Sequence, residues 1–286
     1  MGDFIEARRP ASAMPAGVAG NRTPRLRVRG LSAGYGGRTV LHDVDFDAAP
    51  GRVTVLVGPN GCGKSTLLKA MARVLRPSAG EVLLDGASLH DLPTRRVARA
   101  LALLPQGPTP PEGLTARELV AQGRFPHQTL FRQWSAEDAR AVDEAMRAAD
   151  VAKFADRPIA ALSGGERQRC WIAMVLAQET ELLLLDEPTT FLDLKGQIDV
   201  MRLLRRIART EGRTLVAVLH ELNLAAAFAD EIVMMRDGRV RAAGAPEDVM
   251  TPPVLHDVFG LDAQMLRDPE TGRPICVPRT GPETPE

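Results

Sequence analysis

The chain has 286 residues, in which 36 Lys and Arg balance 36 Asp and Glu, and 44% of the residues are hydrophobic but only 4% are aromatic. This length is sufficient for one large hydrophobic core or two smaller ones. A formal net charge of zero argues against nucleic acid as the main partner, because nucleic-acid-binding domains usually carry an excess of basic residues.

The cysteines, the apolar runs and the N-terminal segment further narrow the class of protein to which this chain can belong. Cys62, Cys170 and Cys276 are far apart and form no CxxC pair, which indicates neither a disulfide framework nor a zinc site and fits a reducing cytosol. No apolar run approaches the roughly 18 residues of a membrane-spanning helix, so we expect none. Residues 1–25 carry scattered Arg and Pro without a continuous apolar stretch, and we expect a flexible tail and not a cleavable signal.

The first predicted elements are β-strands. Residues 26–31 (LRVRGL) and 53–57 (VTVLV) are β-like runs, and the turn residues between them predict an antiparallel hairpin that leads into a further strand. The run at 53–57 is apolar at both parities, so we expect it to be buried on both faces. A helix is predicted at 66–75 (TLLKAMARVL).

A glycine-rich loop joins this strand to this helix. Residues 58–65 (GPNGCGKS) fit the pattern G-x-x-x-x-G-K-S in its required context of strand before and helix after. Glycines let the backbone wrap around phosphate oxygens, and the helix N-terminus adds its positive dipole end. We expect Lys64 to reach the β- and γ-phosphates of a nucleotide and Ser65 to bind Mg²⁺. The predicted nucleotide-binding residues of the loop are Gly58, Pro59, Asn60, Gly61, Cys62, Gly63, Lys64, Ser65 and Thr66.

The thiol of Cys62 has two interpretations. Its place near Lys64 and a helix N-terminus can lower the pKa of a thiol and make it reactive. Alternatively, Cys62 merely fills a variable position of the loop, and the sequence leaves both interpretations open.

Strands and helices alternate through the rest of the chain, which predicts a parallel sheet with crossover connections. Residues 112–157 have helical spacing and predict a helical subdomain. The other predicted elements are strands at 81–86, 101–106, 182–188, 214–221, 232–238 and 239–244, helices at 170–178 and 195–210, and a hairpin around 268–274.

These elements together predict an α/β fold: a P-loop NTPase core with a mixed, mainly parallel sheet, an N-terminal antiparallel β part and a helical subdomain. The expected divisions are a tail (1–25), the β part with the phosphate-loop core (26–106), the helical subdomain (107–161), the second half of the core (162–249) and a C-terminal extension (250–286).

Two carboxylates follow the apolar strand predicted at 182–188. Asp186 and Glu187 lie at its carboxyl end, where α/β sheets bind ligands. We expect Asp186 to hold Mg²⁺ and Glu187 to act as the general base that polarises the attacking water. An acidic pair at a strand end can also simply cap the next turn, but the phosphate loop favours the catalytic interpretation.

The segment LSGGERQR at 162–169 resembles the signature of ATP-binding-cassette (ABC) ATPases. Gln106, Asp193 and His220 follow the family order as well. By this resemblance, Gln106 senses Mg²⁺ and the transmembrane partner, Asp193 couples two sites, and His220 contacts the γ-phosphate. The family pairs two cassettes head to tail, so the signature loop of one subunit meets the ATP held by the other. The signature residues that this implies for nucleotide binding are Ser163, Gly164, Gly165 and Glu166.

The resemblance also assigns the only tyrosine of the chain. Tyr35 lies in AGYGG, upstream of the phosphate loop, where the family stacks an aromatic ring on adenine. The alternative is that Tyr35 only packs in a glycine-rich turn. We expect Trp134 and Trp171 to be packing residues on helices.

Over about residues 26–278 the chain is most similar to the ATP-binding subunits of bacterial iron(III)-siderophore importers. The similarity rests on GLTARELVAQGRFPHQ, CWIAMVLAQETELLLLDEPTTFLDL, VAVLHELN and DPETGRPICVP. It implies an ATPase that uses ATP and Mg²⁺, pairs with a second ATPase subunit, and powers a polytopic permease from the cytoplasmic face of the membrane, with only indirect contact to a substrate-binding protein. Cobalamin and haem importers are the alternative, since they share these motifs.

Two further classes of function are disfavoured. A soluble ABC ATPase acting on nucleic acid is disfavoured by the balanced charge and the missing insertions, and a non-hydrolytic regulatory cassette by the intact Glu187 and His220.

The sequence departs from its relatives at two places. Glu166 stands where they usually have Gln, although Ser163-x-x-Glu166 also fits a helix capping box. Lys195-Gly196 stands where Ala-His is expected, and a helical Gly, costing about 0.8–1 kcal/mol relative to Ala, predicts a looser helix start after Asp193.

The segment 107–130 is predicted to form a groove for a cytoplasmic helix of the permease. Within it, Arg124 is expected to lie on the surface that the permease contacts.

Overall fold

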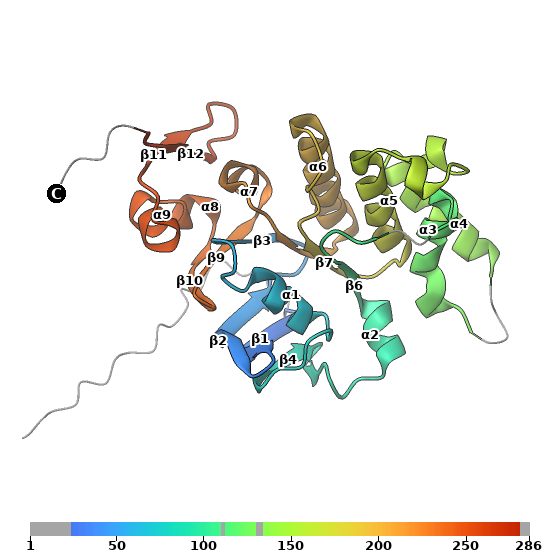
Figure 1. The fold of residues 1–286 in the computed structure, drawn as a ribbon, viewed down its shortest axis with the longest axis horizontal. Coiled ribbons are helices and arrows are strands. Elements are labelled where there is room, and N and C mark those ends of the chain that lie inside the picture. The colour runs from blue at the N-terminus through green and yellow to red at the C-terminus, as the bar shows by residue number, and fades with distance from the viewer. Residues whose placement is uncertain (1–23, 110–111, 130–133, 281–286) are drawn as a thin grey trace, which may run out of the picture.

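The computed structural model describes residues 24–109, 112–129 and 134–280. Its two main sheets and its group of helices confirm the predicted α/β fold (Figure 1). The predicted N-terminal tail lies almost wholly outside the described residues. No helix in the described ranges is long and apolar enough to cross a membrane.

A six-stranded sheet lies at the centre, in the order β10-β9-β3-β8-β7-β6. The pairs from β9 to β6 are parallel and β10 is antiparallel, which confirms the predicted mainly parallel sheet. Every residue of β3, β7 and β8 is buried, as expected for apolar strands covered on both faces. The strands are β3 (Val53–Val57), β6 (Leu101–Leu104), β7 (Leu182–Asp186), β8 (Thr214–Val218), β9 (Glu231–Arg236) and β10 (Arg239–Gly244).

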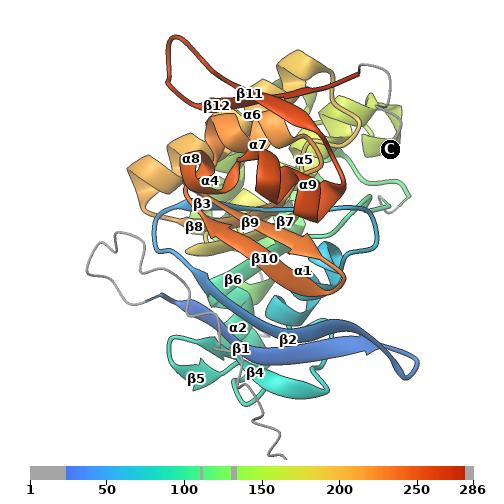
Figure 2. The same ribbon diagram turned by 90° about the vertical axis from the view of Figure 1, so that its left-hand side faces the viewer.

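Alternate residues of β7 face two different cores, as the period of two in a strand requires. Leu182 and Leu184 pack with α1 (Lys64–Met71), which lies between the central sheet and the antiparallel sheet (Figures 1 and 2). Leu183 and Leu185 pack on the opposite side with the helices that cover the other face. These helices are α5 (Gly164–Ala177), α6 (Leu194–Glu211) and α7 (Leu222–Phe228).

The antiparallel sheet has the order β2-β1-β4-β5 and confirms the predicted N-terminal hairpin. Its strands are β1 (Leu26–Tyr35), β2 (Arg38–Ala48), β4 (Ala79–Leu84) and β5 (Ala87–Ser88). The C-terminal hairpin is also confirmed, with strands β11 (Ala263–Arg267) and β12 (Pro274–Pro278).

Several helix boundaries differ from the predicted ones. The helix expected at 66–75 ends at Met71, because Arg73 takes a φ of 62° and the amides of Val74 and Leu75 donate back to the Lys69 carbonyl. Four helices of the described residues were not predicted, because each has at most 8 residues and therefore shows too little of the helical period to be recognised. They are α2 (Thr94–Ala100), α7, α8 (Pro246–Val249) and α9 (Pro252–Phe259).

The looser start expected for the helix after Asp193 stays a prediction, and the structure shows how this helix start is capped. Helix α6 begins directly at Leu194, and the Asp193 carboxylate accepts a hydrogen bond of 2.8 Å from the Gly196 amide. The N-cap therefore satisfies a backbone donor that would otherwise be unpaired at the helix start.

The predicted helical region at 112–157 packs against α5. Trp171 on α5 is buried as expected, whereas Trp134 is half-exposed, so the packing role predicted for Trp134 is wrong. The region contains α3 (Ala116–Ala121), α4 (Ala136–Ala148) and the 3₁₀ helices η1 (Gln122–His127), η2 (Ala152–Phe154) and η3 (Ile159–Ala161).

The expectation that Arg124 lies on the surface is wrong. Its side chain is buried, with 1% of the residue exposed, between η1, α4 and the end of α5. Its guanidinium contacts Asp138 at 2.9 Å and Glu179 at 2.7 Å, and it donates to the Ala177 carbonyl at 2.7 Å. Removing a guanidinium from water carries a large desolvation cost, which only such hydrogen-bonded and charged partners offset. Arg124 therefore holds the helical subdomain together.

Replacing this arginine should therefore lower stability. We expect Arg124→Ala to cost about 3–5 kcal/mol of unfolding free energy, because it removes the cation that is paired with the buried carboxylate of Asp138. Thermal or urea unfolding of the purified chain measures this. The matched control is Arg117→Ala, which removes a half-exposed pair with Asp143 that is worth at most about 1 kcal/mol. Equal losses in the two variants would contradict the structural role of Arg124.

Candidate nucleotide-binding and hydrolysis site

The glycine-rich loop follows β3 and ends where α1 begins. Gly58 has a φ of 155°, and a Cβ there would lie 2.2 Å from the Met235 carbonyl oxygen. Gly63 has a φ of 105°, and a Cβ there would lie 2.7 Å from Leu41. Both positions therefore require glycine, so that the loop can curve tightly between β9 and β2.

Lys64 is the first residue of α1 and its ammonium lies in the curve of the loop. Its Nζ donates to the carbonyls of Gly58 at 2.8 Å and Pro59 at 3.0 Å, and the residue is 5% exposed. The loop thus holds a positive charge beside the positive end of a helix, an arrangement suited to an anion such as phosphate.

Ser65 and Asp186 bring two oxygen atoms together. The Ser65 hydroxyl donates to Oδ1 of Asp186 at 2.9 Å, which joins α1 to the carboxyl end of β7. Burial raises the pKa of Asp186 above its ordinary value, although the bond from Ser65 acts in the opposite direction. A hydroxyl and a carboxylate are oxygen ligands of the kind that Mg²⁺ prefers, so these two residues fit that ion.

Three side chains contact the carboxylate of Glu187. Its Oε1 contacts Nε2 of Gln106 at 2.6 Å and Nε2 of His220 at 2.7 Å, and its Oε2 accepts from Thr190 at 3.1 Å. Burial of the carboxylate opposes ionisation, but these partners outweigh it and lower the pKa of Glu187 below its ordinary value. The carboxylate is therefore ionised at neutral pH and can accept a proton.

The structure thus brings the three predicted catalytic residues together at the carboxyl ends of neighbouring strands. Gln106 follows β6, Glu187 follows β7 and His220 follows β8, and these strands are adjacent in the sheet. Ligands of open α/β sheets bind at this edge.

The capping box predicted at the signature segment is confirmed. The Ser163 amide donates to the Glu166 carboxylate at 2.7 Å, and the Glu166 amide donates to the Ser163 hydroxyl at 3.3 Å. These bonds from Ser163 lower the pKa of Glu166. They also start α5 at Gly164, earlier than the helix predicted at 170–178.

The signature residues share a cavity with Asp193. It has a volume of about 470 Å³, and its lining includes Ser163, Gly164, Gly165, Glu166 and Asp193. Among the described residues, no hydrogen bond or ion pair joins the signature residues to the phosphate loop. Within one chain, therefore, the predicted site residues form two groups.

Gln168, which the sequence analysis missed, links the signature helix to the turn after Glu187. Its buried amide donates to the Pro188 carbonyl at 3.1 Å. A polar residue at the buried side of α5 was the available sequence signal.

Tyr35 ends β1 and is 49% exposed, beside the turn at Gly36 and Gly37. Its ring is therefore free of the core in the described part of the chain, and adenine stacking stays a prediction.

The reactive-thiol interpretation of Cys62 is wrong. The residue is 5% exposed, and burial raises the pKa of its thiol although Lys64 Nζ lies 3.8 Å from Sγ. Cys170 is fully buried as well, and burial raises its pKa to about 12. A reactive cysteine must be exposed to solvent and partly ionised to the thiolate, and neither thiol fulfils these conditions.

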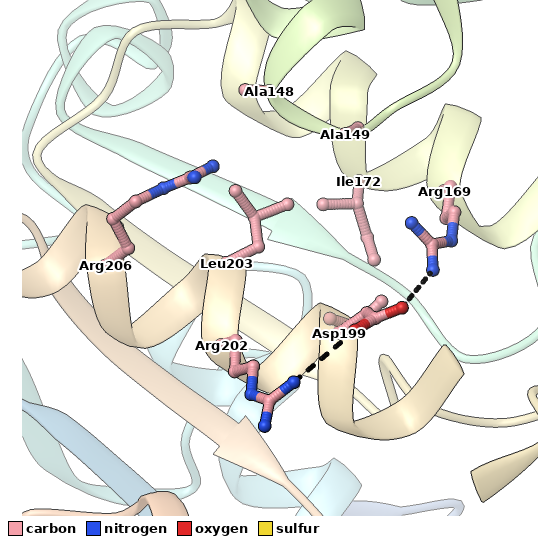
Figure 3. A pocket seen from close by; sticks show the side chains of 9 residues that line it. Ala148, Ala149, Arg169, Ile172, Asp199, Arg202, Leu203 and Arg206 are labelled. Atoms are coloured by element: carbon pink, nitrogen blue, oxygen red, sulfur yellow. Dashed lines mark hydrogen bonds and ion pairs between the residues drawn. The ribbon is translucent and has the colours of Figure 1, made fainter. Parts of the chain in front are cut away.

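A second cavity lies between α4, α5 and α6 and is separate from the predicted nucleotide residues (Figure 3). It has a volume of about 290 Å³. Asp199 on α6 reaches Arg169 on α5 at 3.5 Å and Arg202 at 3.9 Å. The pair with Arg169 connects the signature helix to α6.

A family model and two known proteins that match this chain are all described as parts of transport systems. The family described as ABC transporter matches residues 41–190. The chain is 49% identical to the probable siderophore transport system ATP-binding protein YusV of Bacillus subtilis (strain 168), over 87% of this chain and 90% of the relative. It is 48% identical to the hemin import ATP-binding protein HmuV of Rhodococcus jostii (strain RHA1), over 89% of this chain and 86% of that relative.

Two solved structures are similar in fold. One is an inward-facing transporter of the metal-chelate ABC type, with a TM-score of 0.78 and 28% identity over 90% of this chain and 98% of that chain. The other is the dimeric cassette MJ0796, with a TM-score of 0.69 and 28% identity over 77% of this chain and 98% of that chain.

Proposed function

We propose, since this chain belongs to the ABC transporter family, that its ATPase activity drives import of iron(III)-siderophore complexes through a separate membrane permease. The observation that carries the proposal is the arrangement at the edge of the sheet. An ionised Glu187 follows Asp186 at the carboxyl end of β7, and Asp186 is joined by a hydrogen bond to Ser65 at the end of the phosphate loop.

We assign the roles in hydrolysis from this geometry. Lys64 and the loop amides bind the phosphates of ATP, with Lys64 exchanging its loop carbonyls for phosphate oxygens. Ser65 and Asp186 are the residues that would hold Mg²⁺, which neutralises charge on the phosphates when it is bound. Glu187 takes a proton from the attacking water, and His220 and Gln106 orient the Glu187 carboxylate. His220 would also bind the γ-phosphate of ATP, and Gln106 would help to hold Mg²⁺.

A second ATPase subunit completes the site in this proposal. The signature residues and Asp193 form a group apart from the phosphate loop of their own chain. A head-to-tail pair of cassettes places each signature loop against the ATP of the partner, and the similarity to a dimeric cassette supports this arrangement. Tyr35, exposed at the end of β1, is assigned to adenine stacking.

The permease is proposed to contact the helical subdomain. Phe125 is 64% exposed there, next to the buried Arg124, and an exposed aromatic ring is the type of residue that anchors protein interfaces. The chain would then lie at the cytoplasmic face of the membrane, and the substrate-binding protein would contact only the permease.

Iron(III)-siderophore is the proposed cargo, with haem and cobalamin as the alternatives. The siderophore and hemin relatives are 49% and 48% identical to the chain. The sequence segments named above favour siderophore iron, and no described residue of the ATPase is assigned to cargo.

The test is an uptake assay in intact cells. Cells from which this chain is deleted should lose uptake of radioiron-labelled ferric siderophore and keep uptake of labelled haem and cobalamin. Restoring the chain should restore siderophore uptake, and the chain should copurify with a polytopic permease. Loss of haem or cobalamin uptake alone would transfer the proposal to that cargo.

A further inference from the structure

The carboxylate of Glu187 accepts a hydrogen bond from Thr190 in addition to its contacts with Gln106 and His220. The hydroxyl of Thr190 donates to Oε2 at 3.1 Å, whereas Gln106 and His220 both contact Oε1. The two oxygens of the carboxylate are therefore held by different parts of the molecule. The partners of Oε1 come from neighbouring strands, and the partner of Oε2 comes from the turn that carries Glu187 itself.

The backbone of this turn sets the position of the hydroxyl. Glu187 has a φ of 52°, and the Thr190 amide donates to the Glu187 carbonyl at 3.2 Å. This bond closes a β-turn in which Pro188 holds the second position, where the proline ring restricts φ. The first and fourth side chains of the turn then lie close enough to bond.

A second contact fixes the turn from outside. The Gln168 amide on α5 donates to the Pro188 carbonyl at 3.1 Å, and both residues are buried. Thr190 is β-branched, so its side chain has few rotamers. The hydroxyl is consequently a rigid donor, although a glutamate side chain by itself is flexible.

We propose that Thr190 is a positioning residue that anchors Oε2 of Glu187, so that Oε1 is the oxygen that receives the proton of the attacking water. The inference rests on the proposed ATPase function. In that function Gln106 would help to hold Mg²⁺ and His220 would bind the γ-phosphate, and Oε1 would then be free for the attacking water. Thr190 has no role in binding nucleotide and keeps its bond to Oε2 throughout.

Hydrolysis is then an attack of water on the γ-phosphorus. An O–H bond of water breaks and its proton goes to Oε1, while the water oxygen forms a bond to the γ-phosphorus. The bond between the γ-phosphorus and the β–γ bridging oxygen breaks, and its electron pair stays on ADP. Inorganic phosphate and ADP leave, and Oε1 releases the proton to solvent. The contribution of Thr190 is to the geometry of Oε1, where a misplacement of about 1 Å can cost roughly 100-fold in rate.

The experiment compares two substitutions at Thr190 in the complex of the chain with its permease. Thr190→Val keeps the shape and removes the hydroxyl, and Thr190→Ser keeps the hydroxyl. We expect Thr190→Val to lower kcat about 10- to 100-fold with the KM for ATP unchanged, because Oε1 is then no longer held in position for the attacking water. Thr190→Ser should stay within about threefold of wild type by the same argument. The matched control is Thr210→Val, which removes an exposed hydroxyl on α6 that donates to the Arg206 carbonyl.

Two further measurements separate positioning from a role in folding or in binding. Thr190→Val should unfold at the temperature of wild type, and it should cause no additional loss in a Glu187→Gln background, because its effect passes through that carboxylate. If Thr190→Val is unstable, Thr190→Ala provides the same comparison with the Ser variant.

Several results would overturn the inference. They are wild-type turnover in Thr190→Val, a raised KM for ATP with kcat unchanged, and equal losses in the Val and Ser variants. Absence of ATPase activity in the wild-type complex would instead remove the proposed function itself.

Discussion

Glu187→Gln should lower steady-state ATP hydrolysis by the complex of this chain with its permease about 100- to 10,000-fold, the range of a general base. The amide keeps the shape of the side chain and leaves the phosphate loop intact, but it cannot take a proton at neutral pH. ATP should therefore still bind, and an ATP-bound dimer of cassettes should accumulate. Turnover and size-exclusion chromatography with MgATP measure the two effects.

The control for this change is Glu144→Gln, which alters a half-exposed glutamate on α4 that pairs with Arg140. It should turn over ATP like wild type. Turnover in Glu187→Gln equal to that of this control would show that Glu187 is not the base.

Lys64→Ala should fail at an earlier step and lose affinity for ATP itself. The ammonium is the fixed positive charge inside the phosphate loop, where it is 5% exposed and held by the carbonyls of Gly58 and Pro59. Losing a charge-assisted bond to phosphate should weaken ATP binding about 10- to 100-fold. Titration of the purified chain with a fluorescent ATP analogue measures this.

The comparison for Lys64→Ala is Lys195→Ala, which removes an exposed lysine paired with Asp199. It should bind ATP with wild-type affinity. Equal affinities in the two variants would contradict the role of Lys64, provided that thermal unfolding shows both to be folded.

The fold could be predicted where one physical signal dominates a segment. The strands β3 and β7 are apolar at both parities and are buried at every residue, and Asp186 is expected at the carboxyl end of β7 for that reason. Adjacent strands then bring Glu187 and His220 together, because the carboxyl ends of parallel strands share one edge.

The predictions that failed depended on which way a side chain points. Arg124 is charged, and the sequence alone favoured the surface, but Asp138 and Glu179 are distant along the chain and cover it. Cys62 is close to a cation and a helix N-terminus, yet its burial outweighs both effects and raises the pKa of the thiol. Burial of a side chain depends on contacts between distant segments, which local patterns do not contain.

Thr190 and Gln168 were missed for a related reason. Both lie in or beside recognised motifs, but their partners follow from a turn and from a contact between helix and loop. A β-turn with Pro at its second position was visible at 187–190 and could have pointed to the pairing of Glu187 with Thr190.

The most direct test of the central claim is transport and hydrolysis measured together in proteoliposomes that contain this chain and its permease. With binding protein and radioiron-labelled ferric siderophore on the side opposite this chain, iron should cross only when MgATP is present on the side of the chain. ATP hydrolysis and iron transport should fall together in Glu187→Gln. Iron transport at the wild-type rate without ATP, or with Glu187→Gln, would contradict the account.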